Sequence, residues 1–367
     1  MWSVPIREDL VGVEAYGAPQ IEGVIRLNVN ENPFPPSERL VSDSAEAVAN
    51  AVRGLNRYPD RDFPALRCDL ADYLGRESGV RPEESCLWAA NGSNETMHQL
   101  FTAFGGPGRT ALSFVPTYSM YPEYARDTFT RFVTEPRAED FTLDATRVTR
   151  AIDIHRPTIV LLASPNNPTG TALPLSVVAE ACRANSGIVI VDEAYVEFRR
   201  AGTPSALGLL AEHPNLVVSR TMSKAFALAG ARLGYIACGD PAIVEAVRVV
   251  RLPYHLSAVT QAVARTALAH ADDLLGQVDL LRRERDALAD WMRGLGLDVA
   301  DSDANFLLFG RFSDRHAVWR EVLDHGVLIR ETGPDGWLRV SIGAPDENTQ
   351  FRESLLAVLH ADEGSLT

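Results

Sequence analysis

The most constraining feature of this 367-residue sequence is a series of short apolar runs that alternate with helical stretches through its middle. In order, the segments are TIVLLAS, PNNPTG, PLSVVAEACRA, GIVIVDEAY, NLVVSRTMSK and AGARLGYIAC. Short runs rich in β-branched residues, separated by amphipathic stretches, indicate βαβ units, which favour a mostly parallel sheet. We therefore expect an α/β fold.

The pattern changes on either side of this region. After about residue 268, apolar residues at helical spacing predict a long amphipathic helix, and the strand candidates NFLLF, GVLIR and WLRVSIG follow it. A stretch rich in Pro and Asn around ENPFPPSE predicts an irregular N-terminal segment. We expect an arm over 1–35, a large domain over 36–267, and a smaller α+β domain over 268–367 that packs with the arm.

Composition excludes several classes of function. The net charge of −14 argues against a nucleic-acid or anionic-membrane partner, and the longest apolar runs are too short to cross a bilayer. Four cysteines without a CxxC pair, and histidines without HExxH spacing, argue against a disulfide framework or a zinc site. The N-terminus shows no secretory signal pattern. We expect a soluble, cytoplasmic protein that binds no metal.

Among 35 basic side chains, Lys224 is the only lysine. An arginine supplies surface charge equally well, but it does not lose its proton and attack a carbonyl, whereas a lysine with a lowered pKa does. Lys224 is therefore either a Schiff-base lysine or a chance survivor of arginine-rich composition. The count alone leaves both interpretations open.

The positions around Lys224 favour a ligand site. Asn167, Asp192 and the segment 221–224 each follow the end of an apolar run, and ligands of parallel sheets bind beyond the carboxyl ends of the strands. GIVIVDEAY is also compatible with a Walker-B strand, but that requires a GxxxxGK[ST] loop. The only lysine follows a serine, so a nucleotide hydrolase is excluded.

A lysine that carries pyridoxal phosphate needs a specific set of partners. The pyridine nitrogen requires a carboxylate, the phenolic oxygen requires donors, the phosphate requires hydroxyls, amides and an arginine, and the ring requires a flat neighbour. Taken alone, each candidate also has an ordinary interpretation as a helix cap or core residue. The candidates are Asp192 for the nitrogen, Tyr195 and Asn167 for the phenolic oxygen, Thr221, Ser223, Arg232, Ser93 and Asn94 for the phosphate, and Tyr118 for stacking.

Seven motifs in order carry a resemblance to a known family: RYP, GSNE, PTYSMY, SPNNPTG, VDEAYVEF, TMSKAFALAGARLGY and LRVSIG. The chain resembles the fold type I pyridoxal-phosphate aminotransferases from about residue 27 to 343, and among them it is most similar to the histidinol-phosphate aminotransferases. The resemblance implies a mostly parallel seven-stranded sheet. It also implies transamination of L-histidinol phosphate with 2-oxoglutarate, giving imidazole acetol phosphate and glutamate.

The same resemblance implies residue roles. Lys224 would hold the cofactor and act with Asp192 and Tyr195 in catalysis. Tyr58 would reach the cofactor phosphate of the neighbouring subunit, which implies a homodimer. The substrate-binding set would be Arg339 for a carboxylate, Arg330 and Tyr16 for the substrate phosphate, and Asn167.

Three alternatives remain at this level. An aromatic amino-acid aminotransferase and a decarboxylase of phosphorylated amino acids are similar to the same scaffold and share its cofactor motifs. A transcription regulator that senses pyridoxal phosphate would need a basic DNA-binding module, usually at its N-terminus. We do not expect such a module in this acidic sequence.

Overall fold

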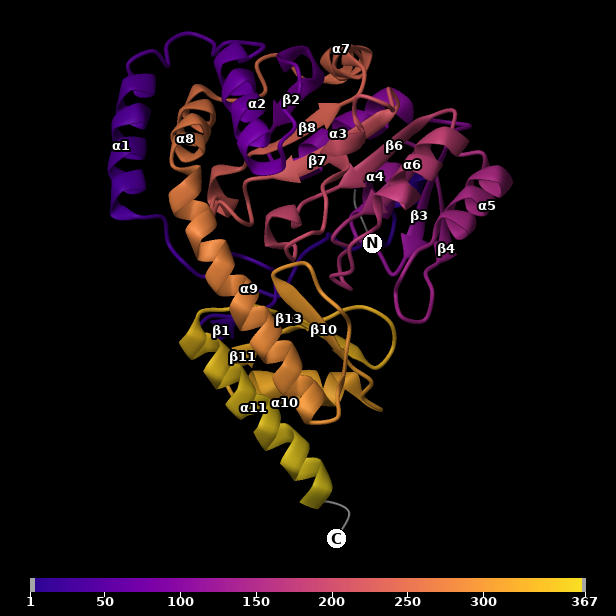
Figure 1. Cartoon of the computed structure of the whole chain (residues 1–367), viewed down its shortest axis with the longest axis vertical. Helices are drawn as coiled ribbons and strands as arrows, with labels where there is room; N and C mark the ends of the chain where they lie inside the picture. Colours follow the sequence, from indigo (N-terminus) through magenta and orange to yellow (C-terminus); the bar gives the residue numbers. More distant parts are fainter. Residues whose placement is uncertain (1–3, 365–367) are drawn as a thin grey trace.

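The computed structural model describes residues 4–364. Its upper part in Figure 1 is built on a seven-stranded sheet in the order β2-β8-β7-β6-β5-β3-β4, in which only β8 runs antiparallel to its neighbours. The expected mostly parallel seven-stranded sheet is confirmed. Its strands are β2 (Leu87–Ala90), β3 (Thr110–Val115), β4 (Arg131–Pro136), β5 (Ile159–Ala163), β6 (Ile188–Asp192), β7 (Leu216–Thr221) and β8 (Gly234–Cys238).

Helices surround this sheet, and a long helix leads from it into the lower part of the molecule (Figure 1). Within residues 4–364, no helix combines the length and the apolar character that crossing a membrane requires. The helices of the upper part are α1 (Glu38–Val52), α2 (Pro64–Ser78), α3 (Ser93–Phe104), α4 (Tyr121–Asp127), α5 (Ala145–His155), α6 (Leu175–Ala184), α7 (Pro241–Val250) and α8 (Ala258–Ala269). The long helix is α9 (Ala271–Gly294).

The three central strands explain where polar residues gather. Every residue of β5, β6 and β7 is buried, as expected for parallel strands covered on both faces. The register aligns Ala163 with Asp192 and Asp192 with Ser219. The strands therefore end together, and the polar segments that follow them begin at one edge of the sheet.

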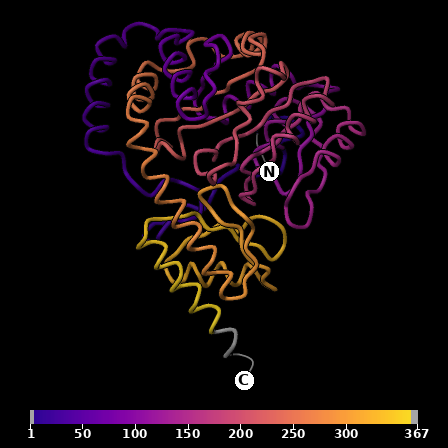
Figure 2. The backbone as a smooth tube through the Cα atoms, viewed as in Figure 1, coloured from indigo at the N-terminus to yellow at the C-terminus, as the bar shows by residue number. Residues whose placement is uncertain are grey.

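The lower part contains a four-stranded antiparallel sheet in the order β12-β13-β10-β9. Figure 2 shows the indigo N-terminal trace running from the foot of α1 into this part, where β1 (Ile25–Arg26) pairs in parallel with β11 (Val327–Leu328). The remaining elements are β9 (Asp298–Val299), β10 (Phe306–Gly310), β12 (Arg330–Glu331), β13 (Trp337–Ser341), α10 (Arg315–Asp324) and α11 (Pro345–Gly364).

Two expectations about these segments need refinement. The stretch GVLIR is not one strand, because β11 pairs with β1 whereas β12 pairs with β13. The N-terminal arm is also not wholly irregular, since it supplies β1. The division into arm, large domain and small domain at residues 35 and 267 stays a proposal, and the two separate sheets support it.

A buried ionic cluster lies beside the sheet edge. Arg220 on β7 is 1% exposed, and its guanidinium contacts Glu77 at 2.8 Å, Glu193 at 2.9 Å and Glu197 at 3.8 Å. Its Nη2 also donates to the Ser205 hydroxyl at 3.0 Å. Since Glu193 follows Asp192 and Arg220 precedes Thr221, the cluster anchors two strand ends that carry predicted site residues.

Replacing Arg220 by methionine should destabilise the protein strongly. The substitution leaves three buried carboxylates without their common cation, which costs about 3–5 kcal/mol of unfolding free energy. Chemical denaturation would measure the change. Arg183→Met is the matched control: its ion pair with Glu180 is exposed, so we expect a change within about 0.5 kcal/mol. Equal effects of the two substitutions would contradict the anchoring role.

Candidate active site

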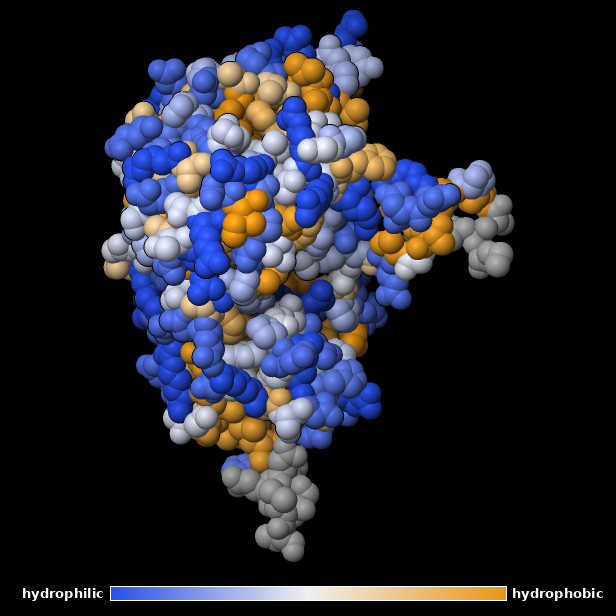
Figure 3. Space-filling view, turned by 90° about the vertical axis from the view of Figure 1, so that its right-hand side faces the viewer, coloured by the Kyte–Doolittle hydropathy of each residue, from blue (hydrophilic) through white to orange (hydrophobic). Residues whose placement is uncertain are grey.

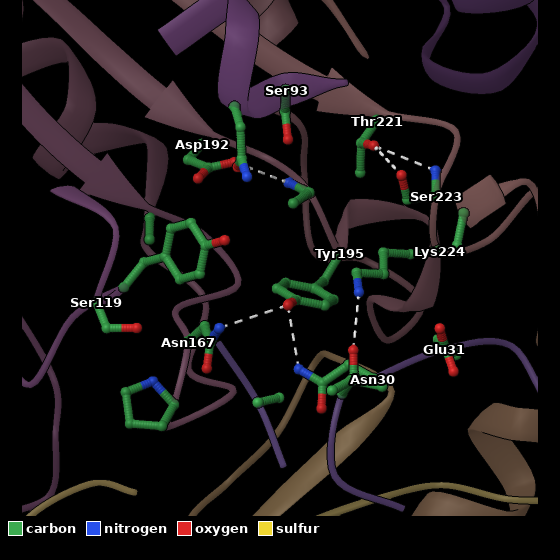
Figure 4. A pocket seen from close by; sticks show the side chains of 18 of the residues that line it. Asn30, Glu31, Ser93, Ser119, Asn167, Asp192, Tyr195, Thr221, Ser223 and Lys224 are labelled. Atoms are coloured by element: carbon green, nitrogen blue, oxygen red, sulfur yellow. Dashed lines mark hydrogen bonds between the residues drawn. The ribbon is translucent and has the colours of Figure 1, made fainter. Parts of the chain in front are cut away.

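A cavity of about 460 Å³ lies at the carboxyl edge of the large sheet and is also lined by residues of the smaller part. Thirteen of the fourteen predicted site residues line it, and Tyr58 does not. Figure 4 shows several of them converging from different elements. The thirteen are Tyr16, Ser93, Asn94, Tyr118, Asn167, Asp192, Tyr195, Thr221, Ser223, Lys224, Arg232, Arg330 and Arg339.

Lys224 follows β7 and extends its amine into the cavity, where Nζ donates to the Val29 carbonyl at 3.0 Å. Burial lowers the pKa of Lys224 to about 8, and the guanidinium groups of Arg339 and Arg232 act in the same direction. Both effects disfavour the charged amine. A neutral, nucleophilic lysine is therefore accessible near physiological pH.

Asp192 ends β6 and is fixed at both carboxylate oxygens. The hydroxyl of Tyr121 donates to Oδ2 at 3.0 Å, and the backbone N–H of Ala194 donates to Oδ1 at 3.2 Å. Burial raises the pKa of Asp192 to about 6, although the Tyr121 hydrogen bond acts against this. Our sequence analysis missed Tyr121, although it is the second tyrosine of the quoted motif PTYSMY.

Tyr195 and Asn167 lie side by side. The Asn167 Nδ2 is 3.5 Å from the Tyr195 hydroxyl, and the Lys224 amine is 5.9 Å from the centre of the Tyr195 ring. The ring packs edge-on against Phe306 at 5.0 Å. A hydroxyl and an amide thus share one wall of the cavity, beside the lysine.

A cluster of hydrogen-bond donors lines another wall of the cavity. Gly92 has a φ of +86° and immediately precedes the first turn of α3, which carries Ser93 and Asn94. A Cβ at Gly92 would come within 2.5 Å of the Arg232 guanidinium, so glycine permits the close approach of arginine to the helix start. The Ser223 hydroxyl lies 3.0 Å from Thr221 Oγ1 and 3.5 Å from Arg232 Nη1. Hydroxyls, an arginine and a helix N-terminus together suit a phosphate.

Two further arginines reach the cavity from the smaller part. Arg339 on β13 donates from Nη1 to Asn167 Oδ1 at 2.6 Å and from Nη2 to the Asn28 carbonyl at 2.7 Å. Burial lowers the pKa of Arg339 to about 10, which still leaves it charged at neutral pH. Within the described residues, Arg339 Nε and Arg330 Nη1 are buried donors without a partner.

Tyr58 lies outside the cavity. Its side chain is 80% exposed and stacks on Tyr254, with ring centres 4.5 Å apart. An exposed stacked pair of this kind is compatible with a role at a neighbouring subunit. That role remains a prediction.

The cavity matches the chemistry of pyridoxal phosphate. It offers a buried carboxylate at Asp192, a hydroxyl and an amide at Tyr195 and Asn167, and an amine at Lys224. A separate cluster of hydrogen-bond donors suits the phosphate. The partnerless donors of Arg339 and Arg330 remain for a substrate anion. These residues fit the cofactor, although their individual roles stay proposals.

Comparisons with known proteins agree with this chemistry. A family model for aminotransferases of class I and II matches residues 22–355. Histidinol-phosphate aminotransferase 3 of Burkholderia lata is 58% identical over 356 residues, covering 97% of this chain and 96% of the relative. Histidinol-phosphate aminotransferase of Thermobifida fusca is 60% identical over 353 residues, covering 96% of this chain and 95% of the relative.

Solved structures have the same fold. The Sinorhizobium meliloti histidinol-phosphate aminotransferase in complex with pyridoxal 5′-phosphate superposes with a TM-score of 0.80 at 24% identity, covering 92% of this chain and 91% of that one. The Thermus thermophilus aspartate aminotransferase with maleate has a TM-score of 0.77 at 25% identity, covering 91% and 90%. At 24% identity, the likeness to the Sinorhizobium meliloti structure shows the fold alone.

The lowered pKa of Lys224 predicts amine reactivity at unusually low pH. In cofactor-free protein, labelling by trinitrobenzenesulfonate should rise with a midpoint near the pKa of about 8, well below the ordinary lysine value of 10.5. Since Lys224 is the only lysine, peptide mapping follows it alone. In Lys224→Arg, only the N-terminal amine should react. A midpoint at the ordinary lysine value would contradict the electrostatic analysis.

Proposed function

The chain belongs to the class I and II aminotransferases, whose cofactor is pyridoxal phosphate, and we propose that it transfers the amino group of L-histidinol phosphate to 2-oxoglutarate. The products are imidazole acetol phosphate and glutamate, which makes the reaction a step of histidine biosynthesis. Relatives named histidinol-phosphate aminotransferase, 52–60% identical over nearly the whole chain, support this donor.

One observation carries the choice of an anionic substrate. Arg339 Nε and Arg330 Nη1 are both buried donors without a partner, and both residues line the cavity that holds Lys224. A buried guanidinium N–H that lacks an acceptor costs free energy, so the site is poised for a ligand that brings anionic oxygens. Tyr16 at the same cavity is a further candidate to contact the substrate phosphate.

When bound, pyridoxal phosphate supplies the electron sink that makes the proton on the substrate's amine-bearing carbon removable. Lys224 Nζ accepts that proton as a general base, and its pKa of about 8 lies close to the working pH where such a base is most effective. Asp192, held by Tyr121, would pair its carboxylate with the cofactor nitrogen. Tyr195 would donate its hydroxyl proton to the phenolic oxygen.

A donor panel tests the proposal. We expect histidinol phosphate to react much faster than L-phenylalanine at matched concentration in single-turnover absorbance measurements. Arg330→Gln should lower kcat/KM for histidinol phosphate by about 10- to 100-fold, since it removes charge-assisted hydrogen bonds. It should change the phenylalanine reaction far less, because phenylalanine has no phosphate.

Arg320→Gln is the matched control for this panel, because Arg320 is an exposed arginine of α10 outside the cavity. It should leave both donors unaffected. Equal or better reaction with phenylalanine in the unaltered enzyme would reassign the protein as an aromatic amino-acid aminotransferase. Histidinol phosphate has no carboxyl group to lose, so the panel also includes a phosphorylated α-amino acid, and release of carbon dioxide from it would instead indicate a decarboxylase.

We also propose that the enzyme is a cytoplasmic homodimer in which Tyr58 reaches the cofactor phosphate of the partner subunit. Large apolar side chains shortly before Tyr254, which stacks on Tyr58, support an interface: Val249 is 84% exposed and Leu252 is 74% exposed. Four cysteines without disulfide bonds suit a reducing compartment. The start of the described chain also projects from the body with apolar residues on it (Figure 3), and Val4 is 58% exposed.

Subunit complementation tests the shared site. We expect Lys224→Arg and Tyr58→Glu homodimers to be nearly inactive, the first because no base remains and the second because a carboxylate repels the phosphate. Random mixing after gentle denaturation should restore about a quarter of the wild-type sites, since half of the dimers are hybrids with one intact site. Mixtures no more active than their parents would contradict a shared site.

A further inference from the structure

Residues 28–30 of the N-terminal segment form hydrogen bonds with three side chains that line the cavity. The Asn28 carbonyl accepts from Arg339 Nη2 at 2.7 Å, the Val29 carbonyl accepts from Lys224 Nζ at 3.0 Å, and the Asn30 side chain reaches Tyr195. Figure 4 shows the hydrogen bond donated by Lys224 and the one between Asn30 and the Tyr195 hydroxyl as separate dashed lines. The Asn30 contact has the clearest chemical consequence.

Asn30 is 1% exposed, and its Nδ2 lies 3.1 Å from the Tyr195 hydroxyl oxygen. An amide has both a donor and an acceptor end, so the role of Asn30 depends on which end faces the tyrosine. With Nδ2 toward Tyr195, the tyrosine oxygen accepts. With Oδ1 toward Tyr195, the tyrosine would donate its hydroxyl proton to the amide oxygen, and that proton would not be available to another acceptor.

Ser341 on β13 favours the first orientation, because the Asn30 side chain is the acceptor for its hydroxyl proton. Its hydroxyl oxygen accepts the backbone N–H of Asn30 at 2.8 Å, and its proton is donated to Asn30 Oδ1 at 2.9 Å. The Asn305 Nδ2 also donates to the Asn30 carbonyl at 3.1 Å. With its backbone held at both ends and its Oδ1 occupied, Asn30 presents Nδ2 to Tyr195.

The second amide beside Tyr195 is oriented in the same sense. Asn167 Oδ1 accepts from Arg339 Nη1 at 2.6 Å, and a guanidinium has no acceptor. The Asn167 Nδ2 therefore also points to the Tyr195 hydroxyl, at 3.5 Å. Donors face the tyrosine oxygen from two sides, so its own proton is free for an acceptor in the cavity.

We propose that Asn30, held by Ser341, is a positioning residue that directs the Tyr195 hydroxyl proton toward the phenolic oxygen of the cofactor. The Asn30 donor also polarises the tyrosine O–H and strengthens it as a donor, because linked hydrogen bonds reinforce one another. Ser341 is two residues from Arg339 on the same strand and thus on the same face. Asn30 therefore links β13, the strand that carries Arg339, to Tyr195.

The proposal deepens the proposed function and rests on its cofactor, but its test uses no substrate. The bound pyridoxal phosphate changes its visible absorbance when its imine nitrogen titrates, and a donor to the phenolic oxygen lowers the pH midpoint of that change. Asn30→Ala weakens the Tyr195 donor, so the midpoint of the holoenzyme should rise by about half to one pH unit.

Two further backgrounds separate positioning from general damage. In Tyr195→Phe, which itself raises the midpoint, adding Asn30→Ala should produce no further rise, because the effect passes through the tyrosine hydroxyl. Ser341→Ala keeps the Asn30 side chain but frees its Oδ1, and the midpoint should again rise. Asn348→Ala removes an equally buried asparagine, which bonds to Gly343 and Glu284, and it should leave the midpoint unchanged.

Two outcomes would overturn the proposal. One is an unchanged midpoint in Asn30→Ala, or in Ser341→Ala if Asn30→Ala does not fold. The other is an Asn30→Ala rise of equal size with and without the Tyr195 hydroxyl, which would place the action of Asn30 elsewhere. Neither outcome depends on the donor substrate, so a failure of the histidinol phosphate assignment would be recognised separately.

Discussion

The parallel register of β5, β6 and β7 is the constraint on which the site depends. Because Ala163, Asp192 and Ser219 lie level across the three strands, the residues that follow each strand start from the same edge. The strands are buried throughout, so their ends are fixed by close packing and do not move independently. Catalytic groups borne on such ends are held with little freedom.

Four basic side chains gather in the cavity, although the chain as a whole is negatively charged. The protein carries a net charge of −14, yet Lys224, Arg232, Arg330 and Arg339 line one cavity. Burial lowers the pKa of Lys224 to about 8 and that of Arg339 to about 10, and neighbouring cations act in the same direction. The same crowding of cations that prepares a neutral lysine also prepares the site for anionic ligands.

The two parts of the molecule meet through polar contacts at this cavity. From the lower part, Arg339 and Ser341 of one strand contact Asn28 and Asn30 of the N-terminal segment. Through Asn30 and Asn167 these contacts reach Tyr195 on the upper part. A ligand bound by Arg339 would thus be linked to the geometry around Tyr195 and Asn167.

The sequence by itself determined the parallel sheet, the lysine and the polar residues at the strand ends. These features are local: buried β-branched runs specify strands, and a motif directly after a strand follows it to the sheet edge. Asn167, Asp192, Thr221, Ser223 and Lys224 line the cavity for this reason. Tyr16, Arg330 and Arg339 also line it, but they come from the N-terminal segment and the smaller part, and only the family resemblance pointed to them. The tertiary structure alone decided the partners. Asn30 and Ser341 are 311 positions apart, and Tyr121 reaches Asp192 across 71 positions. No periodicity along a chain encodes such distant contacts, which arise only when packing brings the strand β13, the N-terminal segment and the sheet edge together.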